Sequence, residues 1–191
     1  MARTREFDTS AVVARAMELF WRRGYEATSV RDLTEHLGVG QGSLYAAFGS
    51  KDGLYRAALE HYRATLAADA LRSLEEGGDA RSAIRAMLIE RIRIACDGGR
   101  GCLFVNAATE RLPGDAATGA VVRAALTASQ DALTGVLSAA AARGEIGSGR
   151  DPRKLAEFLV TFLNGLLVSS KTTPDPRALE PLVEVALDAL R

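Results

Sequence analysis

The most reactive side chains in this 191-residue chain are the thiols of Cys96 and Cys102. Cys102 follows Gly101 in the segment GRGCLFVNAATE, where a helix is expected to begin. The positive end of a helix dipole favours a thiolate, and Arg100 adds a positive charge. Such a thiolate would react with electrophiles or oxidants, and Cys96, six residues earlier, could resolve an oxidised Cys102. Free cysteines are also among the most buried residues, so simple packing stays open for both.

An enzyme built on Cys102 would lack the other groups that thiol catalysis needs. The two histidines, His36 and His61, lie far along the chain from both cysteines, so neither is assigned as a general base. The sequence shows no glycine-rich phosphate loop and no paired carboxylates. No spacing of His and Cys matches a zinc motif, so we expect no metal site and no cofactor. A small thiol-dependent enzyme therefore stays only as an alternative.

Side chains near this segment are also suited to line a ligand cavity. They lie on two predicted helices and combine apolar with polar groups, a mixture common in sites that bind small molecules. The candidates are Met87, Arg91, Phe104, Asn106, Thr109 and Glu110. Arg91 and Glu110 could instead form a structural salt bridge or a solvated face. The sequence does not identify the ligand.

A second group of polar residues lies in TSVRDLTEHLGVGQGSLYAAFGSKDGL, residues 28–54. Ser29 and Asp32 have the spacing of a capping box, and apolar residues follow at i, i+3 and i+7 of one helical face. Gly38 suits the left-handed position just past a helix end. Gly49 ends a second, short helix. The segment therefore predicts a helix-turn-helix, the arrangement that places a helix in the major groove of DNA.

Side chains able to contact DNA remain on the outside of this predicted helix pair. Its apolar residues face inward, which leaves Gln41, Ser43 and Tyr45 at the surface near the start of the short helix. Gly42 has so little bulk that the chain can approach another surface closely. Lys51 lies in the first turn of the next helix, where a cation opposes the helix dipole. A DNA phosphate would supply the missing anion.

The spacing of these residues resembles the DNA-binding region of the TetR family of bacterial transcriptional regulators. The resemblance covers residues 12–62. The matching positions are Phe20, Gly24, Thr28, Leu33, Gly38, Val39, Leu44, Tyr45, Phe48, Lys51 and Leu54. It implies a three-helix DNA-binding head, an all-helical ligand domain, a homodimer and repression that a small molecule relieves.

The resemblance also implies roles for individual residues. Arg31 and Gln41 match base-contacting positions. The positions that match phosphate contacts are Thr28, Ser43, Tyr45 and Lys51. Ala46 and Ala47 stand where many members carry a second aromatic residue and a histidine, so base reading relies more on Gln41 and Arg31. In addition, residues 99–110 resemble a Gly-Cys-Leu…Asn…Glu motif found in a subset of these regulators, some of which respond to electrophiles or oxidants through the cysteine.

Composition and periodicity predict helices along the whole chain. Few aromatic residues, five prolines and many alanines favour an all-α fold. The expected helices are 9–23, 51–75, 81–95, 102–111, 116–142, 152–171 and 177–190, besides the two of the helix-turn-helix. We therefore predict an N-terminal three-helix DNA-binding domain over residues 1–50. A larger helical ligand-binding and dimerisation domain would occupy residues 51–191.

Two of these predicted helices suggest how two subunits could pair. Helix 152–171 is apolar on nearly all sides, so it must be buried on nearly all sides. Helix 116–142 contains eleven alanines and lets a neighbour approach closely. Together they could form half of a four-helix bundle completed by a second subunit, or 152–171 could be the central helix of one monomer. A homodimer would present two heads to a palindromic operator with half-sites about one helical turn apart.

Charge and hydropathy limit the partners of the chain. The formal net charge is zero, and residues 1–63 hold nine Lys or Arg against eight Asp or Glu. This balance disfavours heavy non-specific DNA binding but allows local phosphate contacts. Arg3 and Arg5 could form a basic arm or a frayed terminus. No signal peptide and no membrane span are evident, so we expect a cytoplasmic protein without a membrane partner.

The sequence thus favours a regulator that binds double-stranded DNA and is released by a ligand. Besides the thiol-dependent enzyme, the other alternative is a helical interaction protein that no longer reads DNA.

Overall fold

The computed structural model describes residues 8–72, 74 and 78–191, and these ranges contain helices and turns but no strand. The predicted all-α fold class is confirmed. The helices are α1 (Thr9–Arg23), α2 (Val30–Leu37), α3 (Gln41–Phe48), α4 (Lys51–Tyr62), α5 (Ala68–Arg72), α6 (Ala80–Cys96), α7 (Leu103–Arg111), α8 (Ala116–Ala142), α9 (Pro152–Ser169) and α10 (Pro176–Leu187). The predicted basic arm, Arg3 and Arg5, lies outside the described residues.

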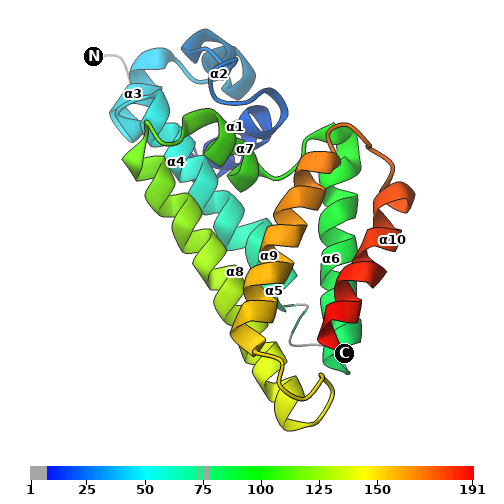
Figure 1. Cartoon of the computed structure of the whole chain (residues 1–191). Helices are drawn as coiled ribbons and strands as arrows, with labels where there is room; N and C mark the ends of the chain where they lie inside the picture. The colour runs from blue at the N-terminus through cyan, green and yellow to red at the C-terminus, as the bar shows by residue number, and fades with distance from the viewer. Residues whose placement is uncertain (1–7, 73, 75–77) are drawn as a thin grey trace.

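Helices α1 to α3 form a small head at one end of the molecule (Figure 1). Ser29 and Asp32 make a reciprocal capping box at the start of α2, and Gly38 ends it in the left-handed conformation with φ of 69°. These are the two features that the sequence predicts for the first helix of the pair. Arg15 of α1 donates a 3.1 Å hydrogen bond to the backbone carbonyl oxygen of Leu37. This oxygen, at the C-terminal end of α2, has no hydrogen-bond donor within its own helix.

A cluster of aromatic rings joins the head to the helices behind it. Phe20 of α1 packs edge-on against Tyr55 of α4, with 4.9 Å between ring centroids. Tyr62, about two turns further along the same face of α4, packs against both Trp21 and Phe104, with 5.0 Å between ring centroids in each pair. One apolar core therefore runs from the head into α7 and α8. It crosses the division at residue 50 that the sequence predicts, and that division stays a prediction.

The rest of the molecule is a bundle of longer helices (Figure 1). The predicted alanine-rich helix is confirmed as α8, which Asp115 caps and which packs lengthwise against α9. On the other side, α6 packs against α10. A second apolar core fills the space between them, with Ile84, Leu88, Leu137 and Leu159 among its fully buried members.

The predicted long helix over residues 51–75 is helical from Lys51 to Arg72, but it is not an α-helix throughout. Helix α4 ends at Tyr62, a π-helical segment follows over Arg63–Ala67, and α5 covers Ala68–Arg72. A π-helical turn inserts an extra residue into the ladder of backbone hydrogen bonds. The segment consists of ordinary helix-forming residues, so its composition gives no warning of this change. The side chain of Leu66, predicted to continue the apolar stripe of α4, lies outside the described residues.

Candidate functional site

The outer surface of α3 is small and carries no charged side chain. Leu44 is fully buried beneath it, whereas Gln41 and Gly42 are exposed and Ser43 is half-buried. Tyr45, one turn along, is 38% exposed. Gly40 precedes the helix without a side-chain cap, so the first backbone N–H groups of α3 are open to a ligand. The head thus presents a polar helix start of a kind that binds phosphate groups well.

Arg31 stands beside this surface on α2. Its side chain is 86% exposed, and its Nε donates a 2.8 Å hydrogen bond to the carboxylate of Glu35 one turn later. Exposed pairs of this kind contribute little to stability, so the guanidinium can exchange the carboxylate for another acceptor. Its placement is consistent with the base-contacting role that the sequence predicts.

Thr28 and Lys51 lie differently from what the sequence suggests. Thr28 is fully buried, and its hydroxyl donates a 2.6 Å hydrogen bond to the carbonyl oxygen of Gly24. That hydroxyl is used inside the head, where a phosphate does not reach it. The Nζ of Lys51 lies 3.9 Å from the centre of the Tyr25 ring, and partial burial lowers the pKa of this lysine. A phosphate would have to draw the ammonium away from the ring.

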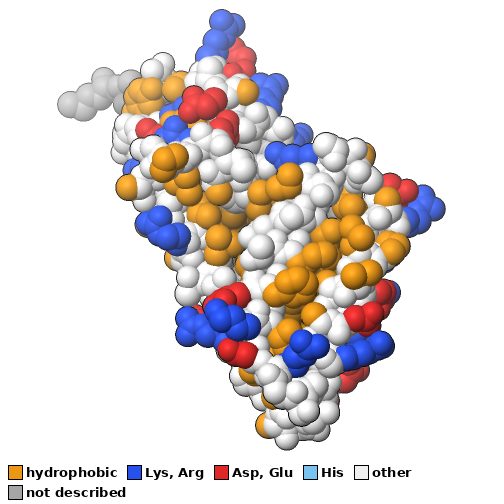
Figure 2. All heavy atoms as spheres, in the orientation of Figure 1, with side chains coloured by type: hydrophobic (Ala, Val, Ile, Leu, Met, Phe, Trp, Pro, Cys, Tyr) orange, Lys and Arg blue, Asp and Glu red, His pale blue; other side chains and the backbone are white. Residues whose placement is uncertain are grey.

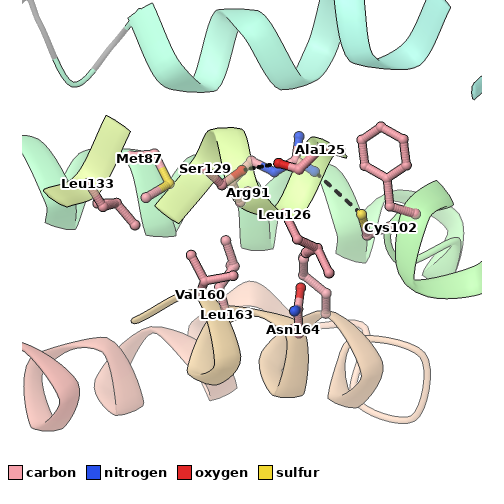
Figure 3. A pocket seen from close by; sticks show the side chains of 12 residues that line it. Met87, Arg91, Cys102, Ala125, Leu126, Ser129, Leu133, Val160, Leu163 and Asn164 are labelled. Atoms are coloured by element: carbon pink, nitrogen blue, oxygen red, sulfur yellow. Dashed lines mark hydrogen bonds between the residues drawn. The ribbon is translucent and has the colours of Figure 1, made fainter. Parts of the chain in front are cut away.

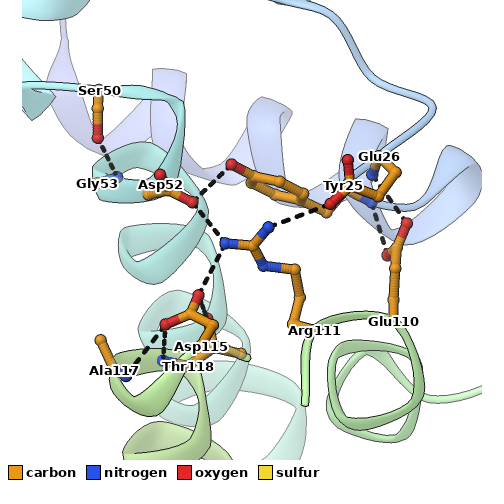
Figure 4. A network of polar contacts seen from close by, with 10 residues as sticks. All are labelled: Tyr25, Glu26, Ser50, Asp52, Gly53, Glu110, Arg111, Asp115, Ala117 and Thr118. Carbon is orange, nitrogen blue, oxygen red and sulfur yellow. Dashed lines mark hydrogen bonds and ion pairs between the residues drawn. The ribbon is translucent and has the colours of Figure 1, made fainter. Parts of the chain in front are cut away.

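A network of polar contacts fastens the end of α7 to the head (Figure 4). The two carboxylate oxygens of Glu110 accept 2.8 Å hydrogen bonds from the backbone N–H groups of Tyr25 and Glu26, which follow α1. Arg111 beside it donates to Glu26 at 3.2 Å and to Asp52, at the start of α4, at 2.7 Å. The end of α7 is therefore bonded both to the head and to the start of α4.

The same network holds Tyr25 and the start of α8. Tyr25 donates a 2.5 Å hydrogen bond to Asp52, and burial together with this bond raises the pKa of Tyr25 to about 12. Arg111 also lies 3.9 Å above the Tyr25 ring and donates to Asp115 at 2.9 Å. The hydroxyl and backbone N–H of Thr118 and the guanidinium of Arg111 hold the pKa of the Asp115 carboxyl well below its usual range.

A small apolar cavity of about 60 Å³ lies between α6, α7, α8 and α9 (Figure 3). Its lining residues are Met87, Arg91, Cys102, Phe104, Ala125, Leu126, Ser129, Leu133, Val160, Leu163, Asn164 and Leu167. Four of the residues predicted from the sequence line it: Met87, Arg91, Cys102 and Phe104. Those contributed by α8 and α9 were not predicted, because helical periodicity does not say which buried face meets a cavity.

Three of the predicted ligand residues, Asn106, Thr109 and Glu110, do not line this cavity. Asn106 donates from Nδ2 to the carbonyl oxygen of Arg100 at 2.9 Å, and Glu110 is bonded to the head as described above. Both side chains face the junction between α1 and α7, where they border a separate polar cleft with Thr109. The alternative of a salt bridge between Arg91 and Glu110 is not formed. Arg91, on α6, lies beside Cys102 at the start of α7, whereas Glu110 lies at the end of α7.

Cys102 lies at the start of α7, as predicted, and is only 5% exposed. The hydroxyl of Tyr62 donates to its sulfur at 3.6 Å, and Arg91 donates to it at 3.7 Å. Arg91 also donates to the Tyr62 hydroxyl at 2.8 Å, and burial raises the pKa of that tyrosine. The cation beside the thiol is thus Arg91. The expected Arg100 instead forms ion pairs with Glu18 and Asp97.

Cys96 occupies a different environment. Its side chain belongs to the second apolar core and donates a weak 3.9 Å hydrogen bond to the carbonyl oxygen of Thr173. Burial raises the pKa of this thiol, which disfavours the nucleophilic thiolate form. Within the described residues no group of His, Cys, Asp and Glu side chains has the arrangement of a metal site. None of the described helices is long and apolar enough to cross a membrane.

An exposed apolar surface runs along α9 and α10 (Figure 2). The large side chains that define it are Phe158 and Val168 of α9 and Leu182 and Val185 of α10, which are 43%, 49%, 45% and 70% exposed. Helix α8 packs on α9 inside the monomer, which is the arrangement that half of the predicted four-helix bundle requires. The large apolar side chains open to a second subunit therefore lie on α10 as well as on α9.

Comparison with known proteins identifies the family to which this chain belongs. Residues 12–58 match the family model described as bacterial regulatory proteins, tetR family, and residues 82–185 match that of the tetracyclin repressor-like C-terminal domain. The chain belongs to the TetR family. It is a DNA-binding transcriptional regulator of the helix-turn-helix type, as the spacing of its head residues predicts.

Relatives align with this chain over nearly its whole length. The uncharacterized HTH-type transcriptional regulator YezE of Bacillus subtilis is 34% identical over 100% of both chains. The HTH-type transcriptional repressor ComR of Escherichia coli is 33% identical over 99% of this chain and 90% of its own. A cysteine mutant of the TetR family regulator CifR, solved with 26-bp double-strand operator DNA, is 35% identical with a TM-score of 0.88, over 99% of this chain and 100% of its own.

Proposed function

We propose that this TetR-family regulator is a homodimeric repressor that binds a palindromic operator through α3 of each head. A small electrophile or apolar molecule that reaches the cavity at Cys102 releases it from the DNA. The main observation in support of operator binding is the polar start of α3, which has no side-chain cap and belongs to a head that matches the family model. The naming of ComR as a repressor and the operator complex of CifR support the direction of control.

The proposed DNA contacts follow from the placement of the head residues. Gln41 and Arg31 read bases, because both are exposed and neither is tied into the core. Ser43, Tyr45 and the backbone at Gly42 contact phosphates. Lys51 joins them once its ammonium leaves the ring of Tyr25. Thr28 is left out, since its hydroxyl is used inside the head.

The proposed dimer pairs the apolar surfaces of α9 and α10. Val185, at 70% exposed, and Leu182, at 45%, would be covered by the same surface of a second subunit. A contiguous apolar surface of this kind marks a protein interface more often than a free surface. Two heads held in this way can occupy two half-sites of one operator, which a monomer cannot do.

The proposed release site is the sulfur of Cys102 inside its cavity. Arg91 and Tyr62 both donate hydrogen bonds to that sulfur, and such donors stabilise negative charge on an attacking nucleophile. They do not supply a general base, because the pKa of Arg91 lies above its usual value and burial raises that of Tyr62. The site is thus better suited to be modified once than to turn over a substrate.

Gel-shift titration tests the DNA-binding and dimer proposals together. The probes are DNA fragments upstream of the gene for this chain and of neighbouring genes, with random DNA of equal length for comparison. Wild type should shift one fragment as a dimer, and Val185→Glu should run as a monomer in light scattering and lose that shift. Glu90→Gln, an exposed change on α6, is the matched control. A Val185→Glu protein that stays dimeric and binds normally would refute the α9–α10 interface.

A further inference from the structure

The polar contacts of Glu110 connect the body of the molecule to the part of the head that precedes the helix-turn-helix. Its carboxylate accepts hydrogen bonds from two successive backbone N–H groups, those of Tyr25 and Glu26, each at 2.8 Å (Figure 4). These groups lie between α1 and the capping residue of α2, Ser29. The side chain of Tyr25 also bonds to Asp52 of α4. The turn that leads into α2 is therefore held by α7 and by α4.

Gly24 makes this contact possible. Its backbone φ of 84° and ψ of 170° belong to a region that residues other than glycine rarely adopt. A Cβ at this position would also lie 3.0 Å and 3.2 Å from the two carboxylate oxygens of Glu110. The carboxylate therefore fits directly against a backbone that carries no side chain. Gly24 and Glu110 form one unit, although 86 residues separate them in the sequence.

The other end of α7 is also fastened to the head. The indole N–H of Trp21 donates a 3.1 Å hydrogen bond to the carbonyl oxygen of Gly101, just before Cys102. Asn106, midway along α7, holds the same loop through its hydrogen bond to the carbonyl oxygen of Arg100. A single short helix is thus bonded to the end of α1 through Gly101, just before its start, and to the turn after α1 through Glu110. Any tilt of α7 at Cys102 must strain the bonds that Glu110 makes.

We propose that Glu110 is a positioning residue for DNA binding. By bonding the turn after α1 to α7, it holds α2 and α3 in the orientation that an operator requires. It also carries the signal from Cys102, because a modification that tilts α7 withdraws the carboxylate from Tyr25 and Glu26. This second step rests on the release proposed above, whereas the positioning role does not depend on it.

The test compares Glu110→Gln with wild type and with Glu90→Gln in operator binding, random-DNA binding and backbone amide exchange. The amide of glutamine keeps the size of the side chain but offers one acceptor oxygen where the carboxylate offers two. We expect Glu110→Gln to bind the operator at least fivefold more weakly and random DNA within twofold of wild type. The amides of Tyr25 and Glu26 should exchange at least tenfold faster, with the dimer intact.

A purely structural role would give a different result. Glu110→Gln would then melt at a lower temperature while its folded dimer bound the operator within twofold of wild type, and the proposal would be overturned. If Glu110→Gln does not fold, Glu110→Asp replaces it, because the shorter side chain reaches one N–H group and should give an intermediate loss. Unchanged exchange at Tyr25 and Glu26 in both variants would equally refute the contact.

The signal is tested by treating each protein with N-ethylmaleimide. In wild type, modification of Cys102 should weaken operator binding and speed exchange at Tyr25 and Glu26 together. In Glu110→Gln, whose contact is already broken, it should change operator affinity less than twofold. An equal loss in both proteins would show that the signal bypasses Glu110. If modified wild type keeps its operator, release through Cys102 fails, and the unmodified variants still decide the positioning role.

Discussion

The surface of α3 and the interior around Cys102 both carry polar side chains, but these have different surroundings. Gln41, Ser43 and Tyr45 make no side-chain hydrogen bond within the described part of the chain. Around Cys102, the Arg91 guanidinium and the Tyr62 hydroxyl bond to each other and to the sulfur. Polar groups without internal partners are available to another molecule, whereas buried and bonded groups hold the fold together until something displaces them. The comparison predicts that substitutions on α3 change DNA affinity and leave stability alone, whereas substitutions that remove a bonded group around Cys102 lower stability.

The largest effect is expected from Arg91→Ala. This change leaves the Tyr62 hydroxyl and the Cys102 sulfur without their cationic partner and opens space in a packed interior. The lost hydrogen bonds and the space left in the interior together cost about 3–5 kcal/mol, which for a chain of this length lowers the melting temperature by roughly 10 °C. Calorimetry measures it.

Arg93→Ala provides the matched control on the same helix. Arg93 is 61% exposed and reaches Glu180 only at 3.7 Å, so its removal should change stability by about 0.5 kcal/mol or less. Equal melting temperatures for the two variants would show that the buried guanidinium does not stabilise the fold. The contrast between interior and surface would then fail.

The next effect is expected from Gln41→Ala and Arg31→Ala on DNA binding. Each good base contact contributes about 1–3 kcal/mol of discrimination, so operator affinity should fall while affinity for random DNA changes little. Both side chains are exposed, and the melting temperature should stay close to that of wild type. Fluorescence anisotropy with both DNAs measures the ratio. The base-reading assignment is wrong if neither change alters operator preference, and Glu35→Ala controls for the lost ion pair of Arg31.

The smallest change in stability or affinity is expected from a substitution at Asp115. This residue is half-buried, between the exposed side chains of α3 and the buried groups around Cys102. It caps α8 through the backbone N–H groups of Ala117 and Thr118, so Asp115→Ala should cost about 1 kcal/mol at neutral pH. Because the pKa of its carboxyl is lowered in the folded state, this contribution is present above the unfolded value of about 3.9 and is lost as the pH falls below it.

Urea unfolding at several pH values measures this difference. The gap between wild type and Asp115→Ala should narrow from pH 6 to pH 2, whereas exposed Asp131→Ala on the same helix should stay near wild type throughout. A gap that widens as the pH falls would contradict the direction of the pKa shift at Asp115.

The head could be predicted in detail because its signals are local. The capping box of Ser29 and Asp32 and the left-handed Gly38 act over a few residues, and they fix the start and end of α2. The surface positions on α3 then follow from helical periodicity alone. The alanine-rich α8 was predicted to the residue for the same reason, since its cap at Asp115 and its composition are continuous in the sequence.

The contacts of the body could not be predicted because their partners are distant in the sequence. Glu110 bonds to a turn 85 residues earlier, and Arg100 pairs with Glu18 across 82 residues. Sequence periodicity shows that such residues share a helix, but not which neighbouring helix they meet. The assignment of Glu110 to the ligand cavity and of Arg100 to the thiol failed for this reason. The four-helix bundle that α8 and α9 would complete with a second subunit stays a prediction, since an apolar face does not identify its partner.

A DNA-release titration on three proteins tests most directly whether Cys102 controls DNA binding. Wild type, Cys102→Ser and Cys96→Ser are each bound to the operator and titrated with N-ethylmaleimide while anisotropy reports the bound DNA. We expect wild type and Cys96→Ser to release the operator once about one equivalent has reacted, and Cys102→Ser to keep its affinity and stay bound. Release of Cys102→Ser as readily as wild type would contradict the account, and the cavity would then have to respond to a molecule that binds without reacting.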